Sequence, residues 1–252
     1  MIEFLVMSFN LRRGSGRSWQ RRRPVVAELL RRERPVLLGT QEGLHGQVTD
    51  LHDDLPDRYD WIGVGRGGGT RDEFMAVFYD TRRLAPVASG HFWLSDTPEV
   101  VASRSWGNRV VRMATWVRFS DLATGKEFVA VNTHFDHESE ESRQRSAALV
   151  RDRVDGFAPL PVVLTGDFNT PAGSASHEIL VGAGLVDTWA ATDARTPLYA
   201  TFHGYGPLVA DGIRIDWILT RGLDVRAAGI NTFSLDGQFP SDHLPVQALV
   251  AI

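Results

Sequence analysis

The chain has 252 residues, of which 43% are hydrophobic and 23% are charged. These proportions are those of an ordinary globular protein, so fibrous, collagenous and wholly disordered proteins are excluded. The 27 Lys and Arg residues and the 31 Asp and Glu residues give a net charge of −4. This charge gives no indication of nucleic-acid binding but does not exclude it. Cysteine is absent, which excludes disulfides, thiolate metal sites and thiol nucleophiles.

The first seven residues, Met1 to Met7, are too short and too acidic to form a signal peptide. No uninterrupted apolar stretch approaches the ~18 residues that a membrane span needs. We therefore expect a cytoplasmic protein without a membrane span. Nothing in the sequence indicates the oligomeric state, which stays open.

Arginine almost completely replaces lysine, because Lys126 is the single lysine among the 27 basic residues. Codon bias of the genome is the simplest explanation. Nine of the arginines lie between Arg12 and Arg34. Arginine binds phosphate through two parallel hydrogen bonds, so this cluster is either a phosphate-facing patch or, for most of its members, the solvated face of a helix.

The first half of the chain predicts mainly strands, with two helices among them. An apolar strand is expected at residues 4–9, and a helix at residues 19–34 places Val25, Val26, Leu29 and Leu30 on one stripe. A strand at residues 36–39 precedes a short helix at residues 45–55. Further strands are predicted at residues 59–64, 74–79, 91–94, 113–119 and 128–131.

The second half begins with a helical pattern at residues 138–155, followed by a strand at residues 161–164. A helix at residues 174–183 has Ser174 as its candidate N-cap. The last strands are predicted at residues 215–219, 225–230 and 246–252. The runs at residues 36–38 and 162–164 are continuously apolar, which is typical of strands buried on both faces.

The order of these elements is neither a regular alternation of strands and helices nor an all-β meander. It favours an α/β layered protein with mixed sheets, in which long loops leave the strand ends. The sequence has no internal repeat and no low-complexity linker. We therefore expect a single domain that covers residues 1–252.

Polar side chains repeatedly follow or precede the apolar strands. A single Asp or Asn in such a place is more often a turn or a helix cap than a ligand. Asp216 alone would be a buried carboxylate paired with Arg214. Repetition at six strand ends, without any cysteine, instead indicates an oxygen-rich site for a hard cation at one edge of a layered sheet. The residues concerned are Asn10, Glu42, Asn132, His134, Asp136, His137, Asp167, Asn169, Asp216, Asp242 and His243.

In this order, the segments resemble the endonuclease/exonuclease/phosphatase superfamily, the deoxyribonuclease-I-like metal-dependent phosphohydrolases. The motifs Gly166-Asp167-Phe168-Asn169 and Ser241-Asp242-His243 carry the resemblance together, and it extends over nearly the full chain. Residues 92–98, 132–137 and 201–204 resemble a bacterial branch of the superfamily. The resemblance implies a four-layer α/β sandwich, with two mixed β-sheets packed face to face and flanked by helices.

The resemblance also implies a divalent-metal-dependent phosphoester hydrolase. Its cofactor would be Mg²⁺ or Mn²⁺, with Glu42 as the principal metal carboxylate and Asn10 and Asp242 near it. Asp167 would orient or deprotonate the attacking water. Asn169 would hold a phosphate oxygen.

The remaining site residues are expected around the phosphoryl group. His243, with Asp216 behind it, would donate to the phosphoryl oxygens, because a carboxylate behind an imidazole favours its protonated form. His134 would be a second donor. Contacts to the substrate are expected from Arg112 as a phosphate clamp and from Asn132, Asp136 and His137.

Two departures from the family pattern limit this transfer of roles, one at Arg12 and one in the absence of a tyrosine that matches the phosphate-binding tyrosine of the abasic-site nuclease branch. Arg12 stands where the abasic-site nuclease branch has an Asp near the metal, so we expect a thinner metal shell there. Glu73 is either a partner of His134 or a solvated loop charge.

The first hypothesis for the function is a phosphodiesterase, and the alternative is a phosphomonoesterase for small molecules or sugar phosphates. A catalytically silent binding protein is less compatible with an intact Asp216–His243 pair, and an amide-cleaving metallohydrolase usually needs a histidine-rich zinc site. The substrate is a phosphate ester whose leaving group stays open. The loops expected to select it lie at residues 65–72, 97–108 and 188–207.

Overall fold

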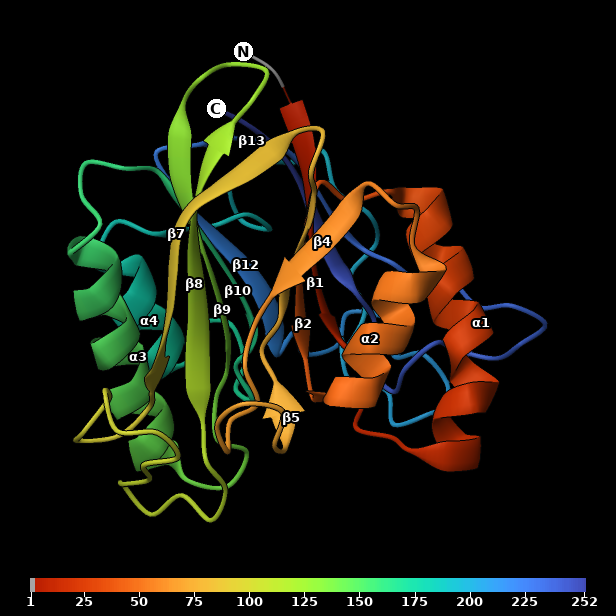
Figure 1. Cartoon of the computed structure of the whole chain (residues 1–252), viewed down its shortest axis with the longest axis horizontal. Coiled ribbons are helices and arrows are strands. Elements are labelled where there is room, and N and C mark those ends of the chain that lie inside the picture. Colours follow the sequence, from red (N-terminus) through yellow and green to blue (C-terminus); the bar gives the residue numbers. More distant parts are fainter. Residues whose placement is uncertain (1–2) are drawn as a thin grey trace.

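The computed structural model describes residues 3–252 and contains two six-stranded mixed sheets that pack face to face (Figure 1). Helices α1 (Gly16–Glu33) and α2 (His45–Asp54) cover the outer face of the first sheet. Helices α3 (Glu140–Asp155) and α4 (Ala175–Val181) cover the outer face of the second. This four-layer α/β sandwich confirms the expected fold class.

Each sheet is built around one pair of parallel strands. The first has the order β13-β14-β1-β2-β6-β4, and β1 runs parallel to β2. The second has the order β11-β12-β10-β9-β8-β7, and β9 runs parallel to β10. All other neighbouring strands of these two sheets are antiparallel.

In the first sheet, the strands are β1 (Glu3–Asn10), β2 (Leu37–Gln41), β4 (Tyr59–Ile62), β6 (Val77–Asp80), β13 (Asp224–Ile230) and β14 (Val246–Ala251). In the second, they are β7 (Leu84–Trp93), β8 (Met113–Asp121), β9 (Glu127–His134), β10 (Val162–Asp167), β11 (Val186–Asp187) and β12 (Asp216–Arg221). A small separate sheet pairs β3 (Gly43–Leu44) with β5 (Glu73–Phe74).

Three apolar layers hold the sandwich together. Between the sheets, side chains such as Phe4 and Leu37 pack against Phe119 and Phe128. Separate clusters form under α1 and α2 and under α3 and α4. Strands β2 and β10 are buried along their whole lengths, as their continuously apolar sequences predict. Within residues 3–252, no helix is both long and apolar enough to cross a membrane.

The four predicted helices are present with shifted ends. Helix α1 starts at Gly16 rather than residue 19, and α3 starts at Glu140 rather than residue 138. Ser174 caps α4 as expected, because its Oγ accepts a hydrogen bond from the His177 N–H at 3.4 Å. The predicted strand at residues 74–79 is divided, since Met75 and Ala76 separate β5 from β6. The two-residue strands β3 and β11 were not predicted.

Candidate active site

Strand direction explains why the polar residues meet at one edge. Strands β1, β2, β9 and β10 all end there, and the antiparallel strands β12 and β14 begin there. Asp167 and Asp216 are direct cross-strand partners on β10 and β12. The edge therefore collects Asn10, Glu42, His134, Asp167, Asp216 and His243.

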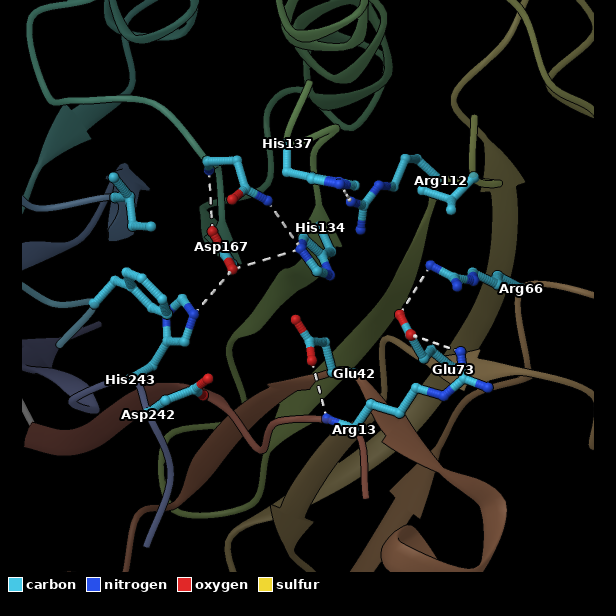
Figure 2. A pocket seen from close by; sticks show the side chains of 14 residues that line it. Arg13, Glu42, Arg66, Glu73, Arg112, His134, His137, Asp167, Asp242 and His243 are labelled. Atoms are coloured by element: carbon cyan, nitrogen blue, oxygen red, sulfur yellow. Dashed lines mark hydrogen bonds and ion pairs between the residues drawn. The ribbon is translucent and has the colours of Figure 1, made fainter. Parts of the chain in front are cut away.

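A cleft of about 460 Å³ lies at this edge. Figure 2 shows charged side chains converging on it, with His243 and Arg66 on opposite sides of Glu42 and His134. The cleft is lined by Arg13, Glu42, Arg66, Glu73, Val110, Arg112, His134, His137, Asp167, Asn169, Phe202, Ile215, Asp242 and His243.

Asn10 joins the two principal carboxylates. Its Nδ2 donates to Glu42 Oε1 at 3.0 Å and to Asp167 Oδ2 at 2.9 Å. Glu42 Oε2 accepts the Arg13 backbone N–H at 2.9 Å. Burial acts to raise the pKa of Glu42, but the hydrogen bonds from Arg13 and Asn10 together hold this pKa below its ordinary value. Glu42 is therefore an ionised carboxylate at neutral pH.

The donor atoms at this place fit a divalent cation. Glu42, His134 and Asp167 each offer a ligand atom, and these atoms lie within 4.8 Å of one another. Carboxylate oxygens are the ligands that Mg²⁺ and Mn²⁺ prefer. Asn10 turns its Nδ2 toward the carboxylates, while its Oδ1 accepts the Arg12 backbone N–H at 2.8 Å.

Asp242 lies on the same cleft but already has a cationic partner. Its Oδ2 is 2.9 Å from Arg12 Nη1, and its Oδ1 accepts from Ser241 Oγ at 3.2 Å. Arg12, the residue that departs from the abasic-site nuclease pattern, thus neutralises one of the expected metal carboxylates. Glu42 and Asp167 are the carboxylates of the cleft without an arginine ion pair among the described residues.

His243 and Asp216 form a buried pair. The distance between His243 Nδ1 and Asp216 Oδ2 is 3.0 Å, and His243 Nε2 lies 3.8 Å from Asp167 Oδ2 (Figure 2). Burial acts to lower the pKa of His243, but Asp216 and Asp167 raise it to about 10. The imidazole is therefore held as a cation, with Nε2 directed toward Asp167.

The surroundings of Asp167 bring the pKa of its carboxyl group close to neutral pH. Its Oδ1 accepts the Asn169 backbone N–H at 3.0 Å. Burial and the neighbouring Asp216 raise its pKa to about 7, against the opposing effects of His243 and Asn10. A carboxylate in this state can take up a proton from water near neutral pH.

His134 has a different protonation state from His243. Its Nε2 is 3.0 Å from Asn169 Nδ2, which donates to it, and 3.4 Å from Asp167 Oδ2. Burial and the nearby Arg112 and Arg66 hold its pKa well below the ordinary value. A neutral imidazole that accepts at Nε2 carries its proton on Nδ1, and Nδ1 has no hydrogen-bond partner among the described residues.

Arg112 is buried at the wall of the cleft and held by the segment after β9. Its Nη2 lies 2.9 Å from His137 Nδ1, and its Nε lies 3.7 Å from Asp136 Oδ2. Asp136 does not line the cleft, which corrects its expected contact with substrate. Its Oδ1 accepts the backbone N–H groups of Glu138 and Ser139, so it fixes the turn behind Arg112.

Glu73 fits neither of its expected alternatives. It is only 6% exposed, and its Oε2 lies 2.8 Å from Arg66 Nη1. Arg13 Nη1 is 3.7 Å from Glu73 Oε1 (Figure 2). Burial raises the pKa of Glu73 to about 7 in spite of Arg66. Glu73 therefore belongs to a charged wall opposite His243 and makes no hydrogen bond to His134.

Asn132 lies beneath the cleft rather than in it. Its Nδ2 donates to the carbonyl oxygens of Thr40 and Ala76, and its Oδ1 accepts from Gln41 Nε2 at 2.7 Å and Thr165 Oγ1 at 3.1 Å. Asn132 is fully buried. Both the Nδ2 and the Oδ1 of Asn132 are hydrogen-bonded to protein groups. Asn132 therefore bridges the two sheets, which corrects its expected contact with substrate.

Sequence reasoning missed part of the lining. Arg66 and Phe202 come from two of the three loops expected to select the leaving group, while the loop at residues 97–108 contributes no lining residue. Arg13, Val110 and Ile215 were not anticipated as lining residues, and Glu73 was considered only as a partner of His134 or a loop charge. The arginine in the glycine-rich segment at residues 65–69 is the signal that could have indicated Arg66.

Carboxylates, a carboxylate-supported histidine and a buried arginine at one edge of an α/β sandwich define a hydrolytic site for phosphate esters. The chain belongs to the endonuclease/exonuclease/phosphatase family, whose model matches residues 7–243. It is thus a phosphohydrolase of this family, whose enzymes depend on divalent metal.

Full-length relatives support this placement. The chain is 34% identical to a mannosyl-6-phosphatase from Bacteroides thetaiotaomicron, with a TM-score of 0.93 over 99% of this chain and 100% of that chain. A family structure from Bacteroides vulgatus is 33% identical, with a TM-score of 0.94 and complete coverage of both chains. An uncharacterized protein, L388, of Acanthamoeba polyphaga mimivirus is 28% identical over 96% of this chain and 97% of that protein.

Proposed function

We propose that this protein hydrolyses phosphodiesters with the help of Mg²⁺ or Mn²⁺. One observation carries the proposal: Asp167 shares Asn10 with Glu42 and lies 3.8 Å from Nε2 of His243. A proton acceptor, a cation-binding carboxylate and a cationic donor thus face the same space. In-line hydrolysis at phosphorus needs these three functions together.

Glu42 is proposed as the main metal ligand, with Asn10 and Asp242 beside it. A bound divalent cation supplies positive charge to the phosphoryl oxygens and favours ionisation of water. Because Asp242 is paired with Arg12, we assign it a weaker part in holding the cation than Glu42.

Asp167 orients the attacking water and accepts its proton. As the water oxygen bonds to phosphorus, the ester bond to the leaving oxygen breaks, and charge increases on the phosphoryl oxygens. His243 donates from Nε2 to these oxygens, while Asp216 stabilises the imidazolium. Arg112 binds a non-bridging oxygen as a planar guanidinium.

A diester is favoured because lining residues of the cleft lie on both sides of these groups. Phe202 lies beside His243, with 5.0 Å between the ring centroids, and is 51% exposed. Arg66 and Glu73 form the opposite wall (Figure 2). Both substituents of a phosphodiester can therefore extend from a phosphate held between Asp167 and Arg112.

A second candidate is a phosphomonoesterase for sugar phosphates, which the likeness to the mannosyl-6-phosphatase favours. The two candidates differ in the charge and size of the ester. A diester is a monoanion with two substituents, whereas a monoester carries close to two charges and only one substituent.

Metal-stripped enzyme assayed with added Mg²⁺ or Mn²⁺ distinguishes these candidates. We expect hydrolysis of bis-p-nitrophenyl phosphate at a higher kcat/KM than p-nitrophenyl phosphate or mannose phosphate, and no turnover of a p-nitrophenyl carboxylic ester. A higher kcat/KM for the monoesters would replace the first candidate by the second. Metal-independent turnover, or cleavage of the carboxylic ester alone, contradicts both.

A further inference from the structure

A second hollow of about 480 Å³ borders the cleft at the start of helix α1. We call it the arginine groove, and it is lined by Arg12, Arg17, Ser18, Arg21, Arg22, Tyr205 and Gln238. Four of these seven residues are arginines, and none is a carboxylate. The groove therefore gathers part of the arginine cluster at residues 12–34 on one surface.

Two of the arginines have free guanidinium groups. Arg17 and Arg21 are exposed, and within residues 3–252 neither side chain makes a hydrogen bond or ion pair. Other arginines of the same helix are neutralised: Arg23 pairs with Asp50 and Asp54, and Arg31 and Arg32 pair with Glu28. The unpaired charge of α1 is thus concentrated at the groove.

The third arginine, Arg22, is buried, and no carboxylate of residues 3–252 forms an ion pair with it. It is 5% exposed, and its guanidinium donates to the carbonyl oxygens of Leu11, Arg12 and Pro240. In the part of the chain that the structure describes, its Nε has no hydrogen-bond partner. Gly14 leaves the necessary space, because a Cβ there would lie 2.7 Å from Arg22 Nη2. Carbonyl oxygens are the only hydrogen-bond acceptors of the Arg22 guanidinium among the described residues, and burying a charge without an opposite charge has an electrostatic cost. An anion in the groove would reduce this cost.

The fourth arginine connects the groove to the cleft. Arg12 lines the groove, and its Nη1 lies 2.9 Å from Asp242 Oδ2, which lines the cleft. The Arg12 guanidinium also lies 4.9 Å from the ring centroid of Tyr205. No acidic residue occupies the first turn of α1, so the partial positive charge of the helix start adds to that of the arginines.

We propose that the arginine groove binds a second phosphate group of the substrate while the reacting phosphate lies in the cleft. This inference rests on the proposed phosphoester hydrolysis. A phosphate suits the groove because its oxygens can pair with several guanidinium groups at once. Such a substrate carries two phosphate groups near each other, either along an oligonucleotide backbone or on a smaller bisphosphorylated molecule.

The test compares two ligands that differ by one phosphate. The dinucleotides TpT and pTpT compete against hydrolysis of bis-p-nitrophenyl phosphate, and the inhibition constant of each is measured at low and high salt. We expect pTpT to bind about tenfold more tightly than TpT, with a preference that decreases as salt increases. The inhibition constant of a longer oligothymidylate without a terminal phosphate shows whether an internal phosphate of a polymer also binds in the arginine groove.

The double variant Arg17→Gln/Arg21→Gln should reduce the ratio of the two inhibition constants to about one. The control Arg31→Gln/Arg32→Gln removes the same charge further along α1 and should keep the ratio. Equal inhibition by TpT and pTpT in the wild type, or an unchanged ratio in the groove variant, overturns the inference.

Failure of the underlying function has a different result, because bis-p-nitrophenyl phosphate is then not hydrolysed at all. In that case, calorimetric titration of pTpT and TpT into the wild type and both variants measures the groove directly. We expect the ratio of the dissociation constants of TpT and pTpT to be about ten in the wild type and the control, and about one in the groove variant. Equal dissociation constants in the wild type, or an unchanged ratio in the groove variant, overturn the inference.

Discussion

Two histidines in one cleft acquire opposite protonation states from their neighbours. His243 lies 3.0 Å from Asp216, and its pKa is raised to about 10. His134 is fully buried and lies near Arg112 and Arg66, so its pKa is lowered. The residue type alone does not reveal this difference, because the charges come from other strands and loops.

Replacement of His243 tests its role as donor. His243→Ala should reduce kcat by about two to four orders of magnitude, the usual range for loss of an acid or an oxyanion donor. Asp216→Asn should reduce kcat less, since the imidazole keeps its position. The double variant should be scarcely slower than His243→Ala, because Asp216 acts through the histidine. Steady-state kinetics and the pH profile provide the measurement.

The direction in which Asp216→Asn shifts the pH profile of the enzyme follows from the negative charge of Asp216. This carboxylate raises the pKa of His243, and activity that needs the imidazolium is lost as the pH increases through that pKa. Removing the carboxylate lowers the pKa, so the alkaline limb of the profile should move to lower pH. Losses that simply multiply in the double variant, or an unfolded Asp216→Asn protein, would assign Asp216 a structural role.

At the scale of elements, the sequence predicted the four helices and most strands because their apolar residues recur at helical or strand spacing. It missed β3 and β11, since two residues are too few to show any period. It placed Asn132 in the site, because an amide at a strand end looks the same whether it faces a cleft or the opposite sheet. Only the packing of the sheets places Asn132 against Thr40 and Ala76.

Asn132→Ala should therefore affect folding more than substrate binding. The change leaves the buried Gln41 Nε2 and two carbonyl oxygens with fewer partners, which should reduce the free energy of unfolding by about 2–4 kcal/mol. Urea denaturation measures this loss. The half-buried Asn231, which donates to Gln247, offers the matched control Asn231→Ala, with an expected loss below about 1 kcal/mol. An equal loss in both variants contradicts the bridging role of Asn132.

At the scale of the whole molecule, bound metal should stabilise the fold, because Glu42 directly follows β2 of the first sheet and Asp167 ends β10 of the second. A ligand that binds only the folded state raises Tm as its concentration exceeds Kd. We expect Mg²⁺ or Mn²⁺ to increase the Tm of EDTA-treated enzyme by several degrees, and Glu42→Gln to require much higher metal concentrations for the same increase. Scanning calorimetry measures the shift. Identical metal dependence in wild type and Glu42→Gln contradicts the assignment of Glu42.

Residues of the cleft also differ in how freely evolution can substitute them, because some lie at the ends of strands and others lie in loops. Groups proposed for the chemistry are fixed at strand ends, whereas Arg66 and Phe202 belong to loops at the same edge. Neither Arg66 nor Phe202 belongs to the inter-sheet core, so substitutions at these two residues leave its packing untouched. A lineage with this architecture can consequently acquire new substrates by exchanging loop residues while inheriting its reaction unchanged, so exchanging residues 65–72 or Phe202 between relatives should transfer substrate preference separately from catalysis.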